Sequence, residues 1–178
     1  MFNPLVTACL RWFGGRPAFR VHGRGRGEAH WRIIDVFATH RRDMDSRWPA
    51  PFFRGTCITW TASVIAVGRD FAEEVLREQA DDPASRDRPV VIEGGRLRGL
   101  ARPASASEVL AHEIGHTCQA RRLGWLYLPC GAAFTLFREG DGWRHWFENQ
   151  ASAAGEFGGL VNGSVDPDLA ARVFPERG

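Results

Sequence analysis

Apolar residues recur with the helical period of 3.6 in two parts of the second half of the chain. The first runs from about residue 107 to 123, where apolar side chains occupy nearly every side of the predicted helix. Ser105 and Glu108 have the spacing of a capping box, and Gly124 suits the C-terminal end of the helix. We therefore predict a buried helix at this position.

A second helix is predicted over residues 143–154. Trp143, Trp146 and Phe147 follow the helical period there, together with smaller residues one and two turns later. The spacing predicts an aromatic stripe that packs against the rest of the molecule.

The first half of the chain has the pattern of a small sheet. Residues 56–68 are rich in β-branched residues on either side of a break of small residues, which predicts a β-hairpin. Residues 31–38 predict a strand or a short helix, because periodicity does not distinguish the two in so short a run. Residues 90–93 predict another strand. Two shorter helices complete the layout, one over residues 71–80 and one from Pro167 to Val173.

A sheet followed by helices is an α+β arrangement, and the length fits one domain. The 178 residues are 44% apolar and 25% charged, as in an ordinary globular protein.

Residues 1–30 are rich in Gly and Arg, which predicts a partly mobile segment ahead of a single domain over residues 31–178. The Gly-Arg-Gly-Arg-Gly run at 23–27 predicts a loop. With a net charge of only +2, we expect no nucleic-acid partner.

The sequence contains no apolar run of the roughly 18 residues that a transmembrane helix needs. The first 15 residues lack the basic start and the small-residue cleavage site of a secretory signal, so we expect a cytoplasmic protein. The apolar run at 125–137 is short and contains Pro129. We interpret it as core, with peripheral membrane contact as the less favoured alternative.

The candidate chemistry lies in the first predicted helix, in the motif His112-Glu113-Ile114-Gly115-His116. Residues four apart lie on one face of a helix, so His112 and His116 can offer two imidazole nitrogens to one Zn²⁺. Glu113 is rotated by about 100° from His112 and can reach a water molecule at the metal without binding the metal. It can then act as general base. Gly115 costs about 1 kcal/mol relative to Ala in a helix interior, so we expect another segment to pack closely there.

A catalytic zinc ion usually has three protein ligands, so a third is needed. We favour Glu148, on the second predicted helix, where the small residues Ala151 and Ser152 let two helices approach. Glu156, near the end of that helix, and Asp141, in a turn flanked by glycine, are weaker candidates.

Two residues are candidates for stabilising an oxyanion beside the metal. His145 lies one turn before Glu148, and Tyr127 is the only tyrosine. Each also has a structural interpretation, His145 at a helix surface and Tyr127 in the core. Glu108, one turn before His112, can orient a histidine or complete the capping box.

These residues resemble the gluzincin clan of zinc peptidases, and the small size is similar to that of its minimal bacterial members. The resemblance covers about residues 109–159 and rests on the His-Glu-Ile-Gly-His motif with the later Glu148-x-x-Ala151. It implies a small zincin-like domain, in which a short N-terminal sheet precedes an active-site helix and a C-terminal helix that carries the glutamate.

The resemblance also implies roles for single residues. It implies Glu113 as the catalytic base, and an edge strand near residues 57–67 that pairs with an extended peptide. The expected activity is zinc-dependent cleavage of peptide bonds in a peptide or protein. The alternative is a non-catalytic metal-binding module for interaction or sensing. The implied zinc ligands are His112, His116 and Glu148.

Overall fold

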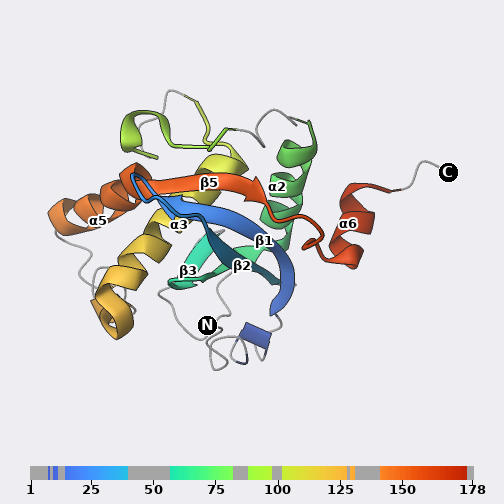
Figure 1. Ribbon diagram of the computed structural model, residues 1–178, viewed down its shortest axis with the longest axis horizontal. Coiled ribbons are helices and arrows are strands. Elements are labelled where there is room, and N and C mark those ends of the chain that lie inside the picture. The colour runs from blue at the N-terminus through green and yellow to red at the C-terminus, as the bar shows by residue number, and fades with distance from the viewer. Residues whose placement is uncertain are drawn as a thin grey trace.

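A five-stranded sheet with helices packed against it forms the described part of the molecule (Figure 1). The computed structural model describes residues 8, 10–11, 15–39, 57–81, 88–97, 102–127, 129–130 and 141–175, with the backbone only at 57, 58 and 141–145. The strands are β1 (Gly15–Gly25), β2 (Arg32–Thr39), β3 (Cys57–Thr61), β4 (Val64–Gly68) and β5 (Gly155–Leu160). The helices are α2 (Arg69–Asp81), α3 (Ala106–Leu123), α5 (Asp141–Ala154) and α6 (Pro167–Val173), with short 3-10 helices η2 (Glu93–Gly95) and η3 (Gly124–Leu126).

This is the predicted α+β class, and the strand order is β3-β4-β2-β1-β5. β2 and β4 are parallel, whereas the other pairs are antiparallel. The predicted hairpin is confirmed as β3 and β4, and the ambiguous run at 31–38 is strand β2. Within the described residues β3 pairs with β4 alone, so it is an edge strand.

Strand β1 corrects the first part of the loop predicted at 23–27, because residues 23–25 are strand and only Arg26 and Gly27 form a turn. It lies inside the sheet, between β2 and β5. Its glycines serve packing, because a Cβ at Gly23 would come within 2.6 Å of Ile34 Cδ1 and 3.0 Å of Ile114 Cγ2. Residues 15–25 of the predicted mobile segment therefore belong to the sheet. Most of residues 1–14 lies outside the described residues.

The C-terminal strand β5 was not predicted, because three glycines in six residues obscure the strand pattern. β5 pairs with β1, so the chain returns to the sheet after its helices. Val90 forms a single bridge to Phe157 of β5, and a 3-10 helix follows at Glu93. The prediction of a full strand over 90–93 is therefore wrong.

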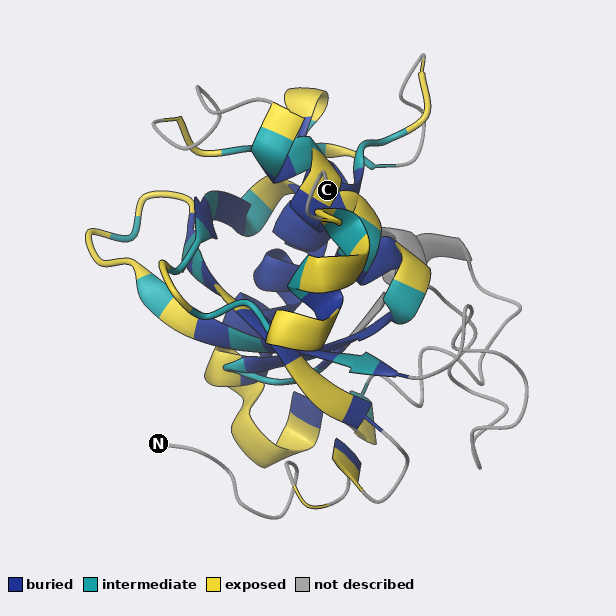
Figure 2. Ribbon diagram, turned by 90° about the vertical axis from the view of Figure 1, so that its right-hand side faces the viewer, coloured by how far each residue is buried: buried dark blue, intermediate teal, exposed yellow. Residues whose placement is uncertain are grey.

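Helix α3 lies across one face of the sheet and is buried over most of its length, as predicted (Figure 2). Leu110, Ala111 and Ile114 pack into the main core with residues of β1, β2 and β4. All of its residues from Ala106 to Ala120 except Val109 are buried. A helix in this position holds its side chains in a fixed register relative to the sheet.

The N-terminus of α3 is held by two elements. Ser105 and Glu108 form the predicted capping box. The Glu78 carboxylate, on α2, accepts hydrogen bonds from the backbone N–H groups of Ala106 and Ser107, at 2.8 Å each. These contacts satisfy N–H groups that have no partner inside the helix. They fix the start of the helix that carries the candidate motif.

The predicted aromatic stripe of α5 is only partly buried. Phe147 is buried, but Trp146 is 52% exposed. The Trp143 side chain lies outside the described residues.

At the C-terminal end of α3, Trp125 is 82% exposed, so the interpretation of this residue as core is wrong. None of the helices in the described ranges combines the length and the apolar character needed to cross a membrane.

Candidate metal centre

Helices α3 and α5 come into backbone contact at the candidate motif. A Cβ at Gly115 would overlap the backbone carbonyl of Ala151, and a Cβ at Gly155 would overlap the carbonyl of Ala111. Ala151 is fully buried. The expected close approach at Gly115 is confirmed, and it brings the Glu148 turn of α5 beside the histidine turn of α3.

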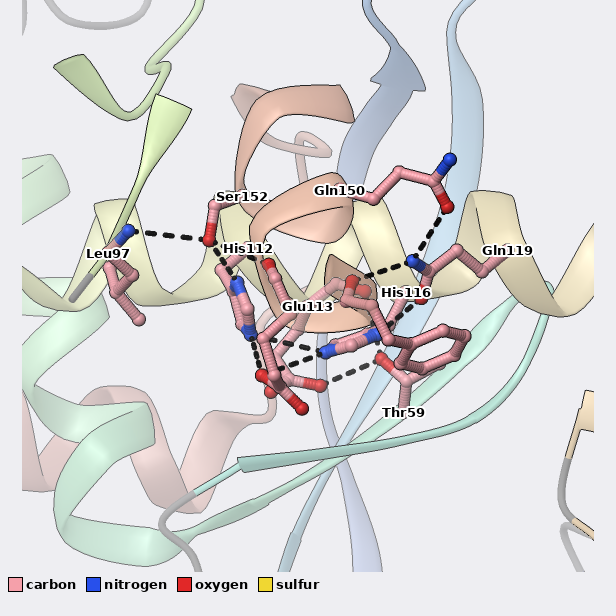
Figure 3. A network of polar contacts seen from close by, with 10 residues as sticks. Thr59, Leu97, His112, Glu113, His116, Gln119, Gln150 and Ser152 are labelled. Carbon is pink, nitrogen blue, oxygen red and sulfur yellow. Dashed lines mark hydrogen bonds and ion pairs between the residues drawn. The ribbon is translucent and has the colours of Figure 1, made fainter. Parts of the chain in front are cut away.

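Three side-chain donor atoms converge between these helices (Figure 3). His112 Nε2 lies 3.1 Å from His116 Nε2. Glu148 Oε2 lies 3.1 Å from His112 Nε2 and 3.5 Å from His116 Nε2. Donors about 2.0–2.1 Å from a tetrahedral zinc ion lie about 3.3 Å from one another. The triangle therefore matches one face of a tetrahedral metal site.

The other ring nitrogen of His112 has a defined partner. His112 Nδ1 lies 2.8 Å from Ser152 Oγ. The Ser152 hydroxyl donates its hydrogen to the backbone carbonyl of Glu148, at 3.0 Å, so it accepts from His112. The Leu97 N–H also donates to it, at 3.3 Å. His112 therefore carries its proton on Nδ1, and Nε2 has a free lone pair.

His116 is held in the same tautomer by Gln119. The Gln119 amide nitrogen donates to the backbone carbonyl of Phe147, at 2.8 Å, and to Gln150 Oε1, at 3.3 Å. Its oxygen therefore faces His116 Nδ1, at 2.7 Å, and accepts the ring proton. The lone pairs of both Nε2 atoms thus point at each other across 3.1 Å, an arrangement that a cation between them would stabilise.

The surroundings of His116 favour its positively charged form. Burial lowers the pKa of His116, but the hydrogen bond to Glu148 and the nearby charges of Glu113 and Glu148 outweigh burial, and the pKa is raised. Burial raises the pKa of Glu148, but its contacts with His112 and His116 outweigh burial, and the pKa lies well below its ordinary value. The negative charges of Glu113 and Glu148 would stabilise a bound metal cation in the same way.

Glu113 lies beside the donor triangle and has a partner of its own. One of its carboxylate oxygens lies within 4.8 Å of the His112 and His116 donor atoms. Glu113 Oε2 accepts a hydrogen bond from Thr59 Oγ1 on β3, at 2.8 Å. The Glu113 carboxylate is thus near the candidate metal position, but one of its oxygens is hydrogen-bonded to Thr59. These distances favour Glu148 over Glu113 as the third donor.

Glu156, a weaker ligand candidate, and Glu108, a candidate for orienting a histidine, both have partners away from the metal centre. Glu156 lies on β5, where it pairs with Arg24 at 2.6 Å, so it is not brought to the site. Glu108 accepts hydrogen bonds from Arg102 and from the Ser105 N–H. It is a capping residue and orients neither histidine, because the histidine N–H groups are bound elsewhere.

Tyr127 is buried next to Phe147, with 6.2 Å between ring centroids. Burial raises the pKa of its phenol, and the nearby carboxylates of Glu113 and Glu148 raise it further. The hydroxyl therefore keeps its proton at neutral pH and remains a hydrogen-bond donor. The side chains of His145 and Asp141 lie outside the described residues.

Three residues of this network were not predicted as site residues. Gln119 lies three residues after His116 and Ser152 lies four after Glu148, so helical spacing already placed each beside its partner. Thr59 had no such signal, because its contact with Glu113 joins residues 54 positions apart.

No family model, curated protein or solved structure matches the chain. The resemblance to gluzincins therefore depends on the sequence alone, on the His-Glu-Ile-Gly-His motif and the later Glu148-x-x-Ala151. The structure adds a buried His-Glu-x-x-His group that could hold a metal ion.

Proposed function

We propose that this protein is a zinc-dependent hydrolase that cleaves peptide bonds. The observation that carries the proposal is the convergence of two imidazole lone pairs and the Glu148 carboxylate beside a second carboxylate, Glu113. Two histidines and one glutamate are a common ligand set of catalytic zinc. Zinc held by His112, His116 and Glu148 would supply Lewis acidity, which lowers the pKa of water and polarises a carbonyl.

Glu113 is the proposed general base. Its carboxylate takes a proton from the attacking water and later gives it to the leaving amine, so the residue is regenerated in each turnover. The protonated phenol of Tyr127 is a candidate donor to the oxyanion that forms on the substrate. His145 remains the other candidate for that role.

The position of β3 supports a peptide as substrate. β3 is an edge strand among the described strands, and Thr59 on β3 touches Glu113. An extended peptide that added to this edge would run past the proposed base. A peptide substrate thus uses two features of this fold, the edge and the metal centre, at once.

The Glu113→Gln variant tests the proposal. We expect it to retain about one zinc per chain, because Glu113 is not a proposed ligand, and to lose at least about 100-fold in the rate of casein cleavage, the usual size of a general-base contribution. Metal content is measured by mass spectrometry and cleavage by release of labelled peptides. The matched control is Glu93→Gln, which removes an exposed carboxylate outside the site.

Two results would contradict the proposal. Wild-type protein that binds no zinc excludes the metal centre, and an active Glu113→Gln variant excludes the base. Stoichiometric zinc with no cleavage of casein or unstructured peptides would instead favour the non-catalytic metal-binding module.

A further inference from the structure

Thr59 joins the edge strand to the proposed general base. Its Oγ1 lies 2.8 Å from Glu113 Oε2 and also 2.8 Å from the backbone carbonyl oxygen of Glu113. The residue is only 4% exposed. Figure 3 shows the Thr59 side chain facing Glu113 between the strand and the helix. A buried hydroxyl with one hydrogen therefore has two acceptors on the same residue.

We infer that Thr59 is a positioning residue for Glu113: its hydroxyl holds Oε2, which leaves Oε1 to take the proton from water. The inference rests on the proposed function and deepens it. A carboxylate with one oxygen bound cannot turn freely about its last bond, so the free oxygen keeps one direction. General-base catalysis requires this, because proton transfer depends on hydrogen-bond geometry with the water.

The carbonyl oxygen of Glu113 gives the Thr59 hydroxyl an acceptor in both protonation states of the Glu113 side chain. While Glu113 is ionised, Thr59 donates to Oε2. Once Oε1 has taken the proton, the neutral carboxyl is a weaker acceptor, and the hydroxyl hydrogen can turn to the Glu113 carbonyl oxygen at the same distance. The buried hydroxyl thus keeps a partner throughout the cycle.

The proton balance closes over one turnover. An O–H bond of water breaks as its oxygen bonds to the carbonyl carbon, and Glu113 holds the released proton. The C–N bond then breaks, and the amine takes the proton from Glu113. Thr59 exchanges no proton in this cycle, so it positions the base and does not itself act on the substrate.

Because the contact between Thr59 and Glu113 is made by a side chain of β3, its effect on kcat can be separated from an effect on KM. The backbone of β3 is the proposed binding edge for the peptide, whereas the Thr59 side chain acts on Glu113. Removing the hydroxyl therefore leaves substrate binding intact and disturbs the chemical step. A loss in kcat with little change in KM is the expected signature.

The test compares Thr59→Val, which removes the hydroxyl at nearly constant shape, with Thr59→Ser, which retains it. On a fluorogenic casein-derived peptide we expect kcat to fall about 10-fold or more for Thr59→Val. Zinc content and zinc affinity should not change, KM should stay within about twofold, and Thr59→Ser should stay within about threefold of wild type. The control is Thr39→Val on β2, a buried threonine that lies neither on the proposed binding edge nor at the metal centre.

A second measurement does not depend on activity. Urea unfolding of the zinc-free wild type, Thr59→Val, Glu113→Ala and the double variant forms a double-mutant cycle. We expect Thr59→Val to lower the unfolding midpoint in the wild-type background and to lower it less in the Glu113→Ala background, where the hydroxyl retains only the backbone carbonyl as acceptor. Additive shifts would overturn the inferred contact.

The outcomes separate this inference from the proposed function. Full activity of Thr59→Val, or a loss in Thr59→Ser as large as that in Thr59→Val, would overturn the positioning role while leaving a peptidase. A wild type that cleaves no peptide would overturn the proposed function and the catalytic role of Thr59 with it, while the unfolding cycle still decides whether the two side chains interact.

Discussion

At the scale of single residues, the tautomers of His112 and His116 decide what the site can bind. Both rings give their Nδ1 proton to a neutral oxygen, on Ser152 and on Gln119, and both present Nε2 to the same point. Neutral acceptors leave the negative charge of the site to Glu148 and Glu113. The motif predicted the two imidazoles, but not the two residues that orient them.

Replacing Ser152 with alanine should weaken metal binding. The variant removes the acceptor for the His112 N–H and the hydrogen bond to the Glu148 carbonyl, so two proposed ligands lose orientation. We expect zinc affinity to fall by about 10- to 100-fold, as for other residues that orient metal ligands. Competition with a chromophoric chelator measures it. Ser164→Ala, on the turn after β5, is the control, and equal affinity in both variants would contradict the interpretation.

At the scale of elements, the crossing of α3 and α5 sets the geometry of the site. Gly115 and Ala151 let the two backbones touch, and Gly155 lets the chain turn from α5 into β5 against Ala111. The predicted periodicity and capping signals located α3 and α5 correctly. The backbone contact between Gly115 and Ala151 decides which residues of α3 face α5. The small residues in the sequence indicated only that the two helices could approach each other.

Replacing Gly115 with alanine should destabilise the protein. Alanine would gain about 1 kcal/mol in helix propensity, but its Cβ would overlap the backbone of Ala151, which cannot move without shifting α5. We expect a net loss of roughly 1–3 kcal/mol in the free energy of unfolding, the usual size for overpacking. Urea denaturation measures it, with Arg122→Ala at the exposed end of α3 as the control. A variant as stable as wild type would show that the helices are further apart.

At the scale of the whole molecule, the sheet order connects distant parts of the chain to the site. β5 follows α5 directly and pairs with β1, so the glutamate-bearing helix is anchored to the N-terminal strand. β3 lies at the opposite edge and contacts α3 through Thr59. The site is thus built from three chain segments, and a metal held by His112, His116 and Glu148 would join two of them, α3 and α5.

Zinc should therefore stabilise the folded protein. A ligand that binds only the folded state at about 1,000 times its Kd adds about 4 kcal/mol to the free energy of unfolding. For a chain of this size that corresponds to a rise of roughly 8–16 °C in Tm. Thermal unfolding with EDTA and then with excess zinc measures the shift. The His116→Ala variant should lose most of it, and an equal shift in that variant would place the metal elsewhere.

The sequence by itself determined the helices, the hairpin and the chemical identity of the candidate ligands, because helical periodicity, caps and the His-Glu-x-x-His spacing are local properties. It did not determine β1 or β5, whose glycines are required by packing against Ile114 and Ala111 and mimic a loop in composition. It also did not determine the partners of Glu113 or of the two histidine N–H groups. The contacts of Glu113 and His112 join α3 to β3 and to α5. The contact of His116 depends on the orientation of the Gln119 amide, which is set by its hydrogen bonds to α5. Only the tertiary structure decides such pairings.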